Sequence, residues 1–148
     1  MIAPPTLLFR VGANTYGCEI GATQEIIPLR PMTRLPGAPP FVRGLINMRG
    51  TIVTVLDLGQ RLDPARQPIE SGAIVLVRDG ARLVGLVVDE VADVRLVSVD
   101  ASTGGGVVRG LAVEESANGE GGDAGDRGDA AAVVVLDLGA LIRQVLLS

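Results

Sequence analysis

The chain has 148 residues, of which 47% are hydrophobic and 20% charged, and its formal net charge is −4. This length fits one domain or two small packed halves, and the lack of any His in the sequence excludes His-based catalytic triads and most zinc sites. Only 2% of the residues are aromatic, so we expect an aliphatic core, whose β-branched residues favour strands.

The first part of the chain is expected to begin with a hairpin. Segments 6–11 and 15–20 are alternating or apolar runs on either side of a Gly-Ala-Asn turn. Segment 23–30 is expected to form a short helical turn or a strand. Segment 31–40 contains four prolines in ten residues and is therefore predicted to be a stiff loop.

The middle of the chain contains the clearest strand signals. Segment 51–56 (TIVTVL) is predicted to be a strand, and Asp57 follows it where a helix N-cap would stand. Segment 72–91 is predicted to be a hairpin, because two aliphatic runs flank the turn pair Asp79-Gly80.

The last third combines further strands with a loop-rich segment. Segment 91–100 alternates apolar and polar residues. An acidic, Gly-rich insertion is expected at about 115–130, followed by a strand at 131–136 and a C-terminal helix capped by Asp137. The total of nine or ten short strands predicts an all-β protein.

Two short sequences occur twice in the same order. VRGL stands at 42–45 and 108–111, and VLDLG at 55–59 and 135–139. From start to start the spacing is 13 residues in the first copy and 27 in the second, so the second copy is longer by about the length of the acidic insertion. We therefore predict two copies of one structural unit, with a chance match of common residues as the alternative.

Few residues of this sequence offer chemistry. Cys18 is the only Cys and is expected to be a buried apolar side chain. The DLG triplets that begin at Asp57 and Asp137 could supply the paired carboxylates of an aspartic-type hydrolase, but helix capping explains both. A small β-barrel that binds a ligand or oligonucleotide is a further alternative. Against it stand the nearly neutral body of the chain and the scarcity of aromatic residues.

No targeting or membrane signal is expected. The N-terminal residues lack a basic leader with a long apolar core, and the longest apolar run, AAAVVVL, is too short to span a bilayer. We expect a cytoplasmic protein without direct membrane insertion, nucleic-acid partner, metal or cofactor.

An ordered set of motifs resembles the CheW family of chemotaxis coupling proteins. It consists of LLFRVGANTYGCEI, TQEI, TRLPGAPPFVRGLINMRGTIVTVLDLGQRL and IVLVRDGARLVGLVVDEVADV, and it covers about residues 6–100. The C-terminal VVRGLAV and VVVLDLGALI fit the family's ending less distinctively.

The resemblance implies a single domain over 1–148, made of two five-stranded SH3-like β-barrel subdomains around a shared core, with a C-terminal helix. It implies a noncatalytic adaptor rather than an enzyme. The implied partners are the regulatory domain of a chemotaxis histidine kinase and the cytoplasmic helical tip of a chemoreceptor, in arrays at the inner face of the membrane. Which kinase pathway the protein serves stays open.

The resemblance also implies a receptor-side site at Glu25, Asn47, Arg49 and Gly50. Glu25 and Arg49 match the family's charged positions, and the rigid guanidinium fork suits a carboxylate on a partner helix. Asn47 is expected to tie down the bend, and Gly50 to allow a positive φ. The alternative for Arg49 is an internal ion pair, with Glu25 or Asp57, that only holds the loop.

A kinase-side site is expected at Val11, Gly12, Ala13 and Gly44. The first three residues begin the first turn, and Gly44 lies by resemblance near a surface implicated in coupling.

Overall fold

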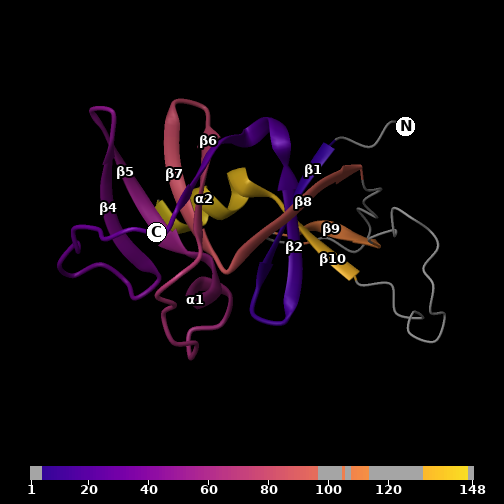
Figure 1. The fold of residues 1–148 in the computed structure, drawn as a ribbon, viewed down its shortest axis with the longest axis horizontal. Coiled ribbons are helices and arrows are strands. Elements are labelled where there is room, and N and C mark those ends of the chain that lie inside the picture. Colours follow the sequence, from indigo (N-terminus) through magenta and orange to yellow (C-terminus); the bar gives the residue numbers. More distant parts are fainter. Residues whose placement is uncertain (1–4, 97–104, 106–107, 114–131, 147–148) are drawn as a thin grey trace.

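The computed structural model describes residues 5–96, 105, 108–113 and 132–146 (Figure 1). The predicted acidic insertion at about 115–130 and the end of the predicted strand 91–100 lie outside them. The strands are β1 (Pro5–Val11), β2 (Asn14–Glu19), β3 (Thr23–Pro28), β4 (Val42–Met48), β5 (Thr51–Asp57), β6 (Ala73–Asp79), β7 (Arg82–Val88), β8 (Glu90–Leu96), β9 (Val108–Val113) and β10 (Ala132–Leu136). The helices are the 3-10 turn η1 (Ile20–Ala22), α1 (Leu58–Leu62) and α2 (Leu138–Leu146).

The strands form two five-stranded sheets, with the orders β8-β1-β2-β10-β9 and β3-β6-β7-β5-β4. Below, these are called the first and the second sheet. The chain passes from the first sheet to the second after β2 and returns at β8 (Figure 1). The prediction of a mainly β protein with little helix is therefore confirmed.

The two sheets have the same strand order and the same register. Each sheet contains an antiparallel hairpin, β1–β2 in the first sheet and β6–β7 in the second. An antiparallel strand, β8 or β3, flanks one side of this hairpin. A parallel strand, β10 or β5, flanks the other side and itself pairs with an antiparallel strand, β9 or β4. Val55 stands opposite Gly85 in the second sheet, and Val135 stands opposite Gly17 in the first. The aligned copies of VLDLG thus meet their parallel neighbours at equivalent positions.

The other half of the repeat is equally regular. Gly44 pairs with Val55 in the β4–β5 ladder, and Gly110 pairs with Val135 in the β9–β10 ladder. In both ladders the register shifts next to this pair. The predicted repeat is therefore present in strand order, in register and in the position of a bulge.

Each repeat ends in a helix that an Asp caps, as predicted. The Asp57 Oδ1 atom accepts a hydrogen bond from the Gln60 backbone N–H at 3.1 Å, and the Asp137 Oδ1 atom accepts one from the Ala140 N–H at 3.1 Å. A side-chain oxygen at this position satisfies one of the backbone donors that a helix leaves unpaired. Both DLG carboxylates are thus engaged in structure, so the capping explanation holds for each.

Of the two alternatives predicted for segment 23–30, the strand is confirmed for its first six residues, because Thr23–Pro28 pairs with β6. One local prediction needs adjustment. The β6–β7 hairpin turns at Gly80 and Ala81 rather than at Asp79-Gly80, since Asp79 already pairs with Arg82. Gly80 has the positive φ of 65° that this turn requires.

An aliphatic core joins the sheets. Its largest cluster combines buried residues of both sheets, such as Phe9 and Leu86, with Leu58 of α1 and Leu141 of α2. A second cluster, which includes Leu76, lies within the second sheet. Cys18 belongs to the shared core, where burial raises the pKa of its thiol to about 11, so the prediction of a buried apolar Cys is confirmed.

Candidate partner-binding site

The β4–β5 hairpin ends in a two-residue turn made of Arg49 and Gly50, since Met48 pairs with Thr51. Both turn residues have positive φ, 53° for Arg49 and 89° for Gly50. Such turns suit the twist of a hairpin, but a side chain other than Gly, Asn or Asp at positive φ is strained. Arg49 is the only described residue other than glycine with this conformation, which marks the position as a candidate for function.

Asn47 holds this turn in place. Its side-chain Oδ1 accepts a hydrogen bond from the Gly50 backbone N–H at 2.8 Å, and its own carbonyl accepts one from Arg30 at 3.1 Å. The expected local role of Asn47 is therefore confirmed, and so is the positive φ of Gly50.

Arg49 and Glu25 form a two-pronged ion pair. The two guanidinium nitrogens Nη1 and Nη2 each donate to one Glu25 carboxylate oxygen at 3.0 Å. The side chains are 71% and 31% exposed, respectively. The hydrogen bonds from Arg49 lower the pKa of Glu25 below its ordinary value, and Glu25 raises the pKa of Arg49.

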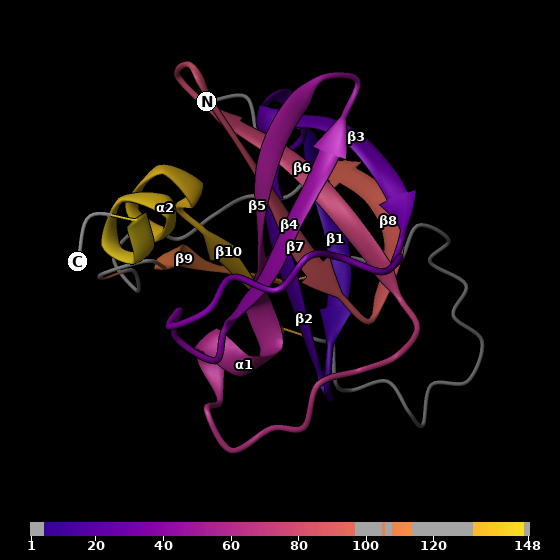
Figure 2. The ribbon, with the colours of Figure 1, turned by 90° about the vertical axis from the view of Figure 1, so that its left-hand side faces the viewer.

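The pair joins the two edges of the second sheet. Glu25 lies on β3 at one edge, and Arg49 lies in the turn of β4, the strand at the other edge. Figure 2 shows this hairpin facing the viewer, with α1 at the far end of β5. All four predicted receptor-side residues thus belong to this end of the sheet, and the internal partner of Arg49 is Glu25 rather than Asp57.

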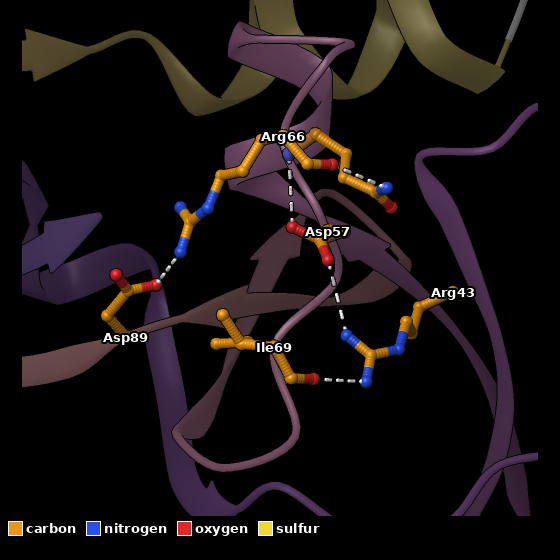
Figure 3. A network of polar contacts seen from close by, with 6 residues as sticks. Arg43, Asp57, Arg66, Ile69 and Asp89 are labelled. Atoms are coloured by element: carbon orange, nitrogen blue, oxygen red, sulfur yellow. Dashed lines mark hydrogen bonds and ion pairs between the residues drawn. The ribbon is translucent and has the colours of Figure 1, made fainter. Parts of the chain in front are cut away.

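Asp57 pairs with a different arginine, Arg43 of β4. The Asp57 side chain is 4% exposed, and its Oδ2 accepts from Arg43 Nη1 at 3.2 Å. Arg43 also donates to the Ile69 carbonyl at 2.6 Å, so it ties the loop between α1 and β6 to the sheet (Figure 3). A charge this deeply buried needs such partners, because an unpaired one is costly.

The same loop is tied to the first sheet through Asp89. Arg66 donates to Asp89 Oδ1 (Figure 3), and Asp89 Oδ2 accepts from the Gly12 backbone N–H at 2.8 Å. Asp89 stands between β7 and β8, where the chain crosses from one sheet to the other. Asp89 therefore links both sheets and the loop.

The predicted kinase-side residues lie on two different sheets. Gly12 and Ala13 are exposed in the β1–β2 turn of the first sheet, whereas Val11 beside them is 5% exposed and packs in the core. Gly44 is buried in β4 of the second sheet. A Cβ at Gly44 would lie 2.6 Å from the Thr33 carbonyl oxygen, so only glycine allows this close backbone approach.

Sequence reasoning missed Arg43 and Arg66. Their partners are 14 to 26 residues away along the chain, and no local spacing links an arginine to such a partner. The 13 basic residues of the chain are all arginines, so residue type did not distinguish these two either.

Within the described residues, we find no group of three or more His, Cys, Asp or Glu side chains placed to hold a metal ion. None of the described helices has the length and apolar character to cross a bilayer.

The described residues therefore define the class of protein: a β protein with two repeated sheets, whose ion pairs and polar turns lie at the ends of strands. The chain matches the model of the CheW-like domain family over residues 5–146 and belongs to this family. The resemblance inferred from the sequence motifs is thereby confirmed.

Similar proteins support this assignment. The chain is 38% identical over 91 residues to the Chemotaxis protein CheW of Klebsiella aerogenes, and 38% identical over 93 residues to that of Rhizobium meliloti. The alignments cover 60% and 62% of this chain, but only 54% and 60% of the two relatives. A third relative, Protein PilI of Pseudomonas aeruginosa, is 31% identical over 93 residues.

A solved structure has the same fold. It is the scaffolding protein TtCheW from Thermoanaerobacter tengcongensis, which superimposes with a TM-score of 0.71 over 91% of this chain and 89% of that chain. The two sequences are 21% identical in this comparison, so the likeness concerns the arrangement of the strands.

Proposed function

We propose that this protein is a noncatalytic adaptor that couples chemoreceptors to a chemotaxis-type histidine kinase. The observation that carries the proposal is the Arg49–Glu25 pair, because it fixes an exposed guanidinium group on a strained turn. The family assignment and the names of the relatives support it. Strain of this kind persists where a function requires the residue.

The receptor side is proposed to be the end of the second sheet, at Glu25, Asn47, Arg49 and Gly50. A helix that approaches this end would meet the outer face of the guanidinium of Arg49, which is 71% exposed. The ion pair with Glu25 fixes the orientation of the guanidinium group beforehand, so less side-chain entropy is lost on binding. The internal pair and the partner contact are therefore compatible roles.

The kinase side is proposed to include the β1–β2 turn, at Gly12 and Ala13, which is exposed and fixed by the bond from Asp89. Val11 and Gly44 would support such a surface from within, because both are buried. The loop network of Arg43 and Arg66 connects β4 and β5 of the second sheet to the β1–β2 turn through Asp89 and would hold them at a constant geometry.

The finer architecture is also part of the proposal. We infer one domain over 1–148 with an acidic insertion at about 115–130, and each sheet closed into an SH3-like barrel. In the second sheet a bridge between Thr33 and Leu45 supports closure, because it joins the chain after β3 to β4 at the opposite edge. The protein would act in the cytoplasm, at receptor arrays, without catalysis of its own.

The test uses purified proteins: this chain, a chemoreceptor cytoplasmic fragment and a chemotaxis histidine kinase from the same cell. We expect the wild-type chain to bind both. Arg49→Ala should weaken receptor binding about tenfold and leave kinase binding and the melting temperature nearly unchanged. Arg34→Ala is the matched control, because Arg34 is exposed on the loop between β3 and β4.

Two results would contradict the proposal. One is a wild-type chain that binds neither protein. The other is an Arg49→Ala variant that loses receptor and kinase binding equally and melts earlier, since that outcome assigns the ion pair to the loop alone.

A further inference from the structure

A pocket of about 560 Å3 opens at the end of the second sheet that carries Arg49. Three parts of the sheet line it: the start of β3, the β4–β5 hairpin and the β6–β7 hairpin. These strand ends and turns come together here because β3, β5 and β7 start at the end of the sheet where β4 and β6 finish. The pocket thus adjoins the proposed receptor side.

The charges around this pocket are unequal. Three guanidinium groups line it, those of Arg49, Arg78 and Arg82, whereas Glu25 is its one carboxylate. Glu25 is engaged by Arg49. Across the described part of the chain, neither Arg78 nor Arg82 has a carboxylate within ion-pair distance.

The repeat provides an internal reference for Arg78. Leu76 and Leu8 occupy equivalent positions, opposite Gly85 and Gly17, so Arg78 corresponds to Arg10 in the first sheet. Arg10 forms an ion pair with Glu90. Arg78 instead donates from Nε to the neutral side-chain oxygen of Gln24 at 2.8 Å, so its charge stays uncompensated in this half.

The pocket also has an apolar part. Its floor includes Met48 and Leu76, which are buried members of the core cluster inside the second sheet. Ile52 on the rim is 62% exposed, the most exposed of the large hydrophobic residues that the structure describes. A ligand that covers this pocket therefore needs an apolar side chain for Ile52 and negative charge for the arginines.

We propose that Arg78 and Arg82 form a second anchor of the receptor-side site, which selects a partner helix with a carboxylate next to an apolar residue. This rests on the proposed function, since it takes the helical receptor tip as the occupant. An amphipathic helix that lays its apolar face over such a surface is a recurrent mode of recognition. Arg78 and Arg82 would bind the acidic residue of the partner helix, because a guanidinium fork matches a carboxylate in shape and charge.

Arg49 and the new anchor play different parts. Arg49 is already paired within the chain, so Glu25 partly neutralises its charge before the partner binds. Among the described residues, no carboxylate lies within ion-pair distance of Arg78 or Arg82, so a carboxylate of the partner has no internal competitor there. Exposed charges of this kind mainly set association rate and partner choice, and salt screens them.

The experiment measures the affinity of the full chain for the cytoplasmic helical hairpin of a chemoreceptor from the same cell. Arg82→Glu is the main variant, because the Arg82 side chain forms no hydrogen bond or ion pair with the described residues. Arg78→Glu is the second variant, and Arg34→Glu is the control with the same change of charge. Circular dichroism and the melting temperature establish that each variant is folded.

We expect Arg82→Glu and Arg78→Glu each to weaken hairpin binding about tenfold, with a smaller dependence on salt, while Arg34→Glu stays within about twofold. A panel of hairpins with single Glu or Asp residues changed to Arg extends the test. One member of the panel should regain affinity for Arg82→Glu and lose it for the wild-type chain.

The outcomes separate the two proposals. If the wild-type chain binds the hairpin but both variants bind like the control, the second anchor is wrong and the proposed function stands. If the variants lose the kinase instead of the hairpin, the occupant is wrong. If the wild-type chain does not bind the hairpin at all, the proposed function fails and the second anchor fails with it.

Discussion

The two sheets share a strand order and a register, yet the connections between their equivalent strands differ. In the second sheet β4 and β5 are joined by the two residues Arg49 and Gly50, whereas in the first sheet segment 114–131 joins β9 to β10. The central strands β1, β6 and β7 are constrained because consecutive residues on both of their faces are buried. Surface connections tolerate changes of length more readily.

The two helix caps allow the sharpest comparison, because among the described residues only the Asp57 cap is also part of a buried ion pair. Asp57→Ala should lower the free energy of unfolding by about 3 kcal/mol, because it removes a helix cap and leaves the half-buried Arg43 without its carboxylate partner. Asp137→Ala should cost about 1 kcal/mol, the value of a cap alone. Urea denaturation measures both, and equal losses would show that the Arg43 pair contributes nothing.

The paired glycines test whether the halves are equivalent in packing. A Cβ at Gly85 would lie 2.8 Å from the Ile74 Cγ2 atom, and one at Gly17 would lie 2.7 Å from Thr6 Cγ2. Both neighbours are β-branched and stiff, so each Gly→Ala change should cost about 2 kcal/mol through overpacking.

Gly21→Ala is the control for these two variants, because a Cβ there meets nothing within 4 Å. It should change the free energy of unfolding by less than about 0.5 kcal/mol. A large loss at Gly85 with none at Gly17 would mean that the register is repeated but the packing is not.

Much of the fold could be predicted from the sequence. The alternation of apolar residues, the turn at Gly80 and the caps at Asp57 and Asp137 are local signals, and the repeated VRGL and VLDLG located the duplicated pair. The pairings of Arg43 and Arg66 could not be predicted, because each joins segments that only the folded chain brings together.

The candidate site was predicted in part for the same reason. Asn47 and Gly50 lie three residues apart, so their mutual hydrogen bond has a local pattern. Arg49 was placed by resemblance to a family, and its partner Glu25 was one of two open choices. The exposure of Arg78 and Arg82 on a shared pocket depends on strand order, which no single segment encodes.

The turn residue Arg49 offers a comparison between stability and function within one half. Arg49→Asn replaces a strained residue with one that favours positive φ before Gly. We expect the melting temperature to rise, because the lost ion pair with Glu25 is exposed and such pairs contribute little. Receptor binding should weaken in the same variant. A lower melting temperature, measured by circular dichroism, would show that the ion pair outweighs the strain.

The smallest expected effect concerns the pKa of Glu25 in its ion pair with Arg49. The pKa of Glu25 is lowered from its ordinary value of 4.5 by the hydrogen bonds from Arg49. A lowered pKa means that the pair contributes its stability at pH values above 4.5 and loses it as the pH falls through the pKa of the folded state. NMR titration of Glu25 should therefore give a higher pKa in Arg49→Ala than in the wild-type chain.

High salt should move the pKa of Glu25 in the wild-type chain toward its value in Arg49→Ala, since screening weakens exposed pairs. A pKa of Glu25 that does not respond to the loss of Arg49 would mean that the two side chains are not paired in solution, and the preorganised fork proposed for the receptor side would then have no basis.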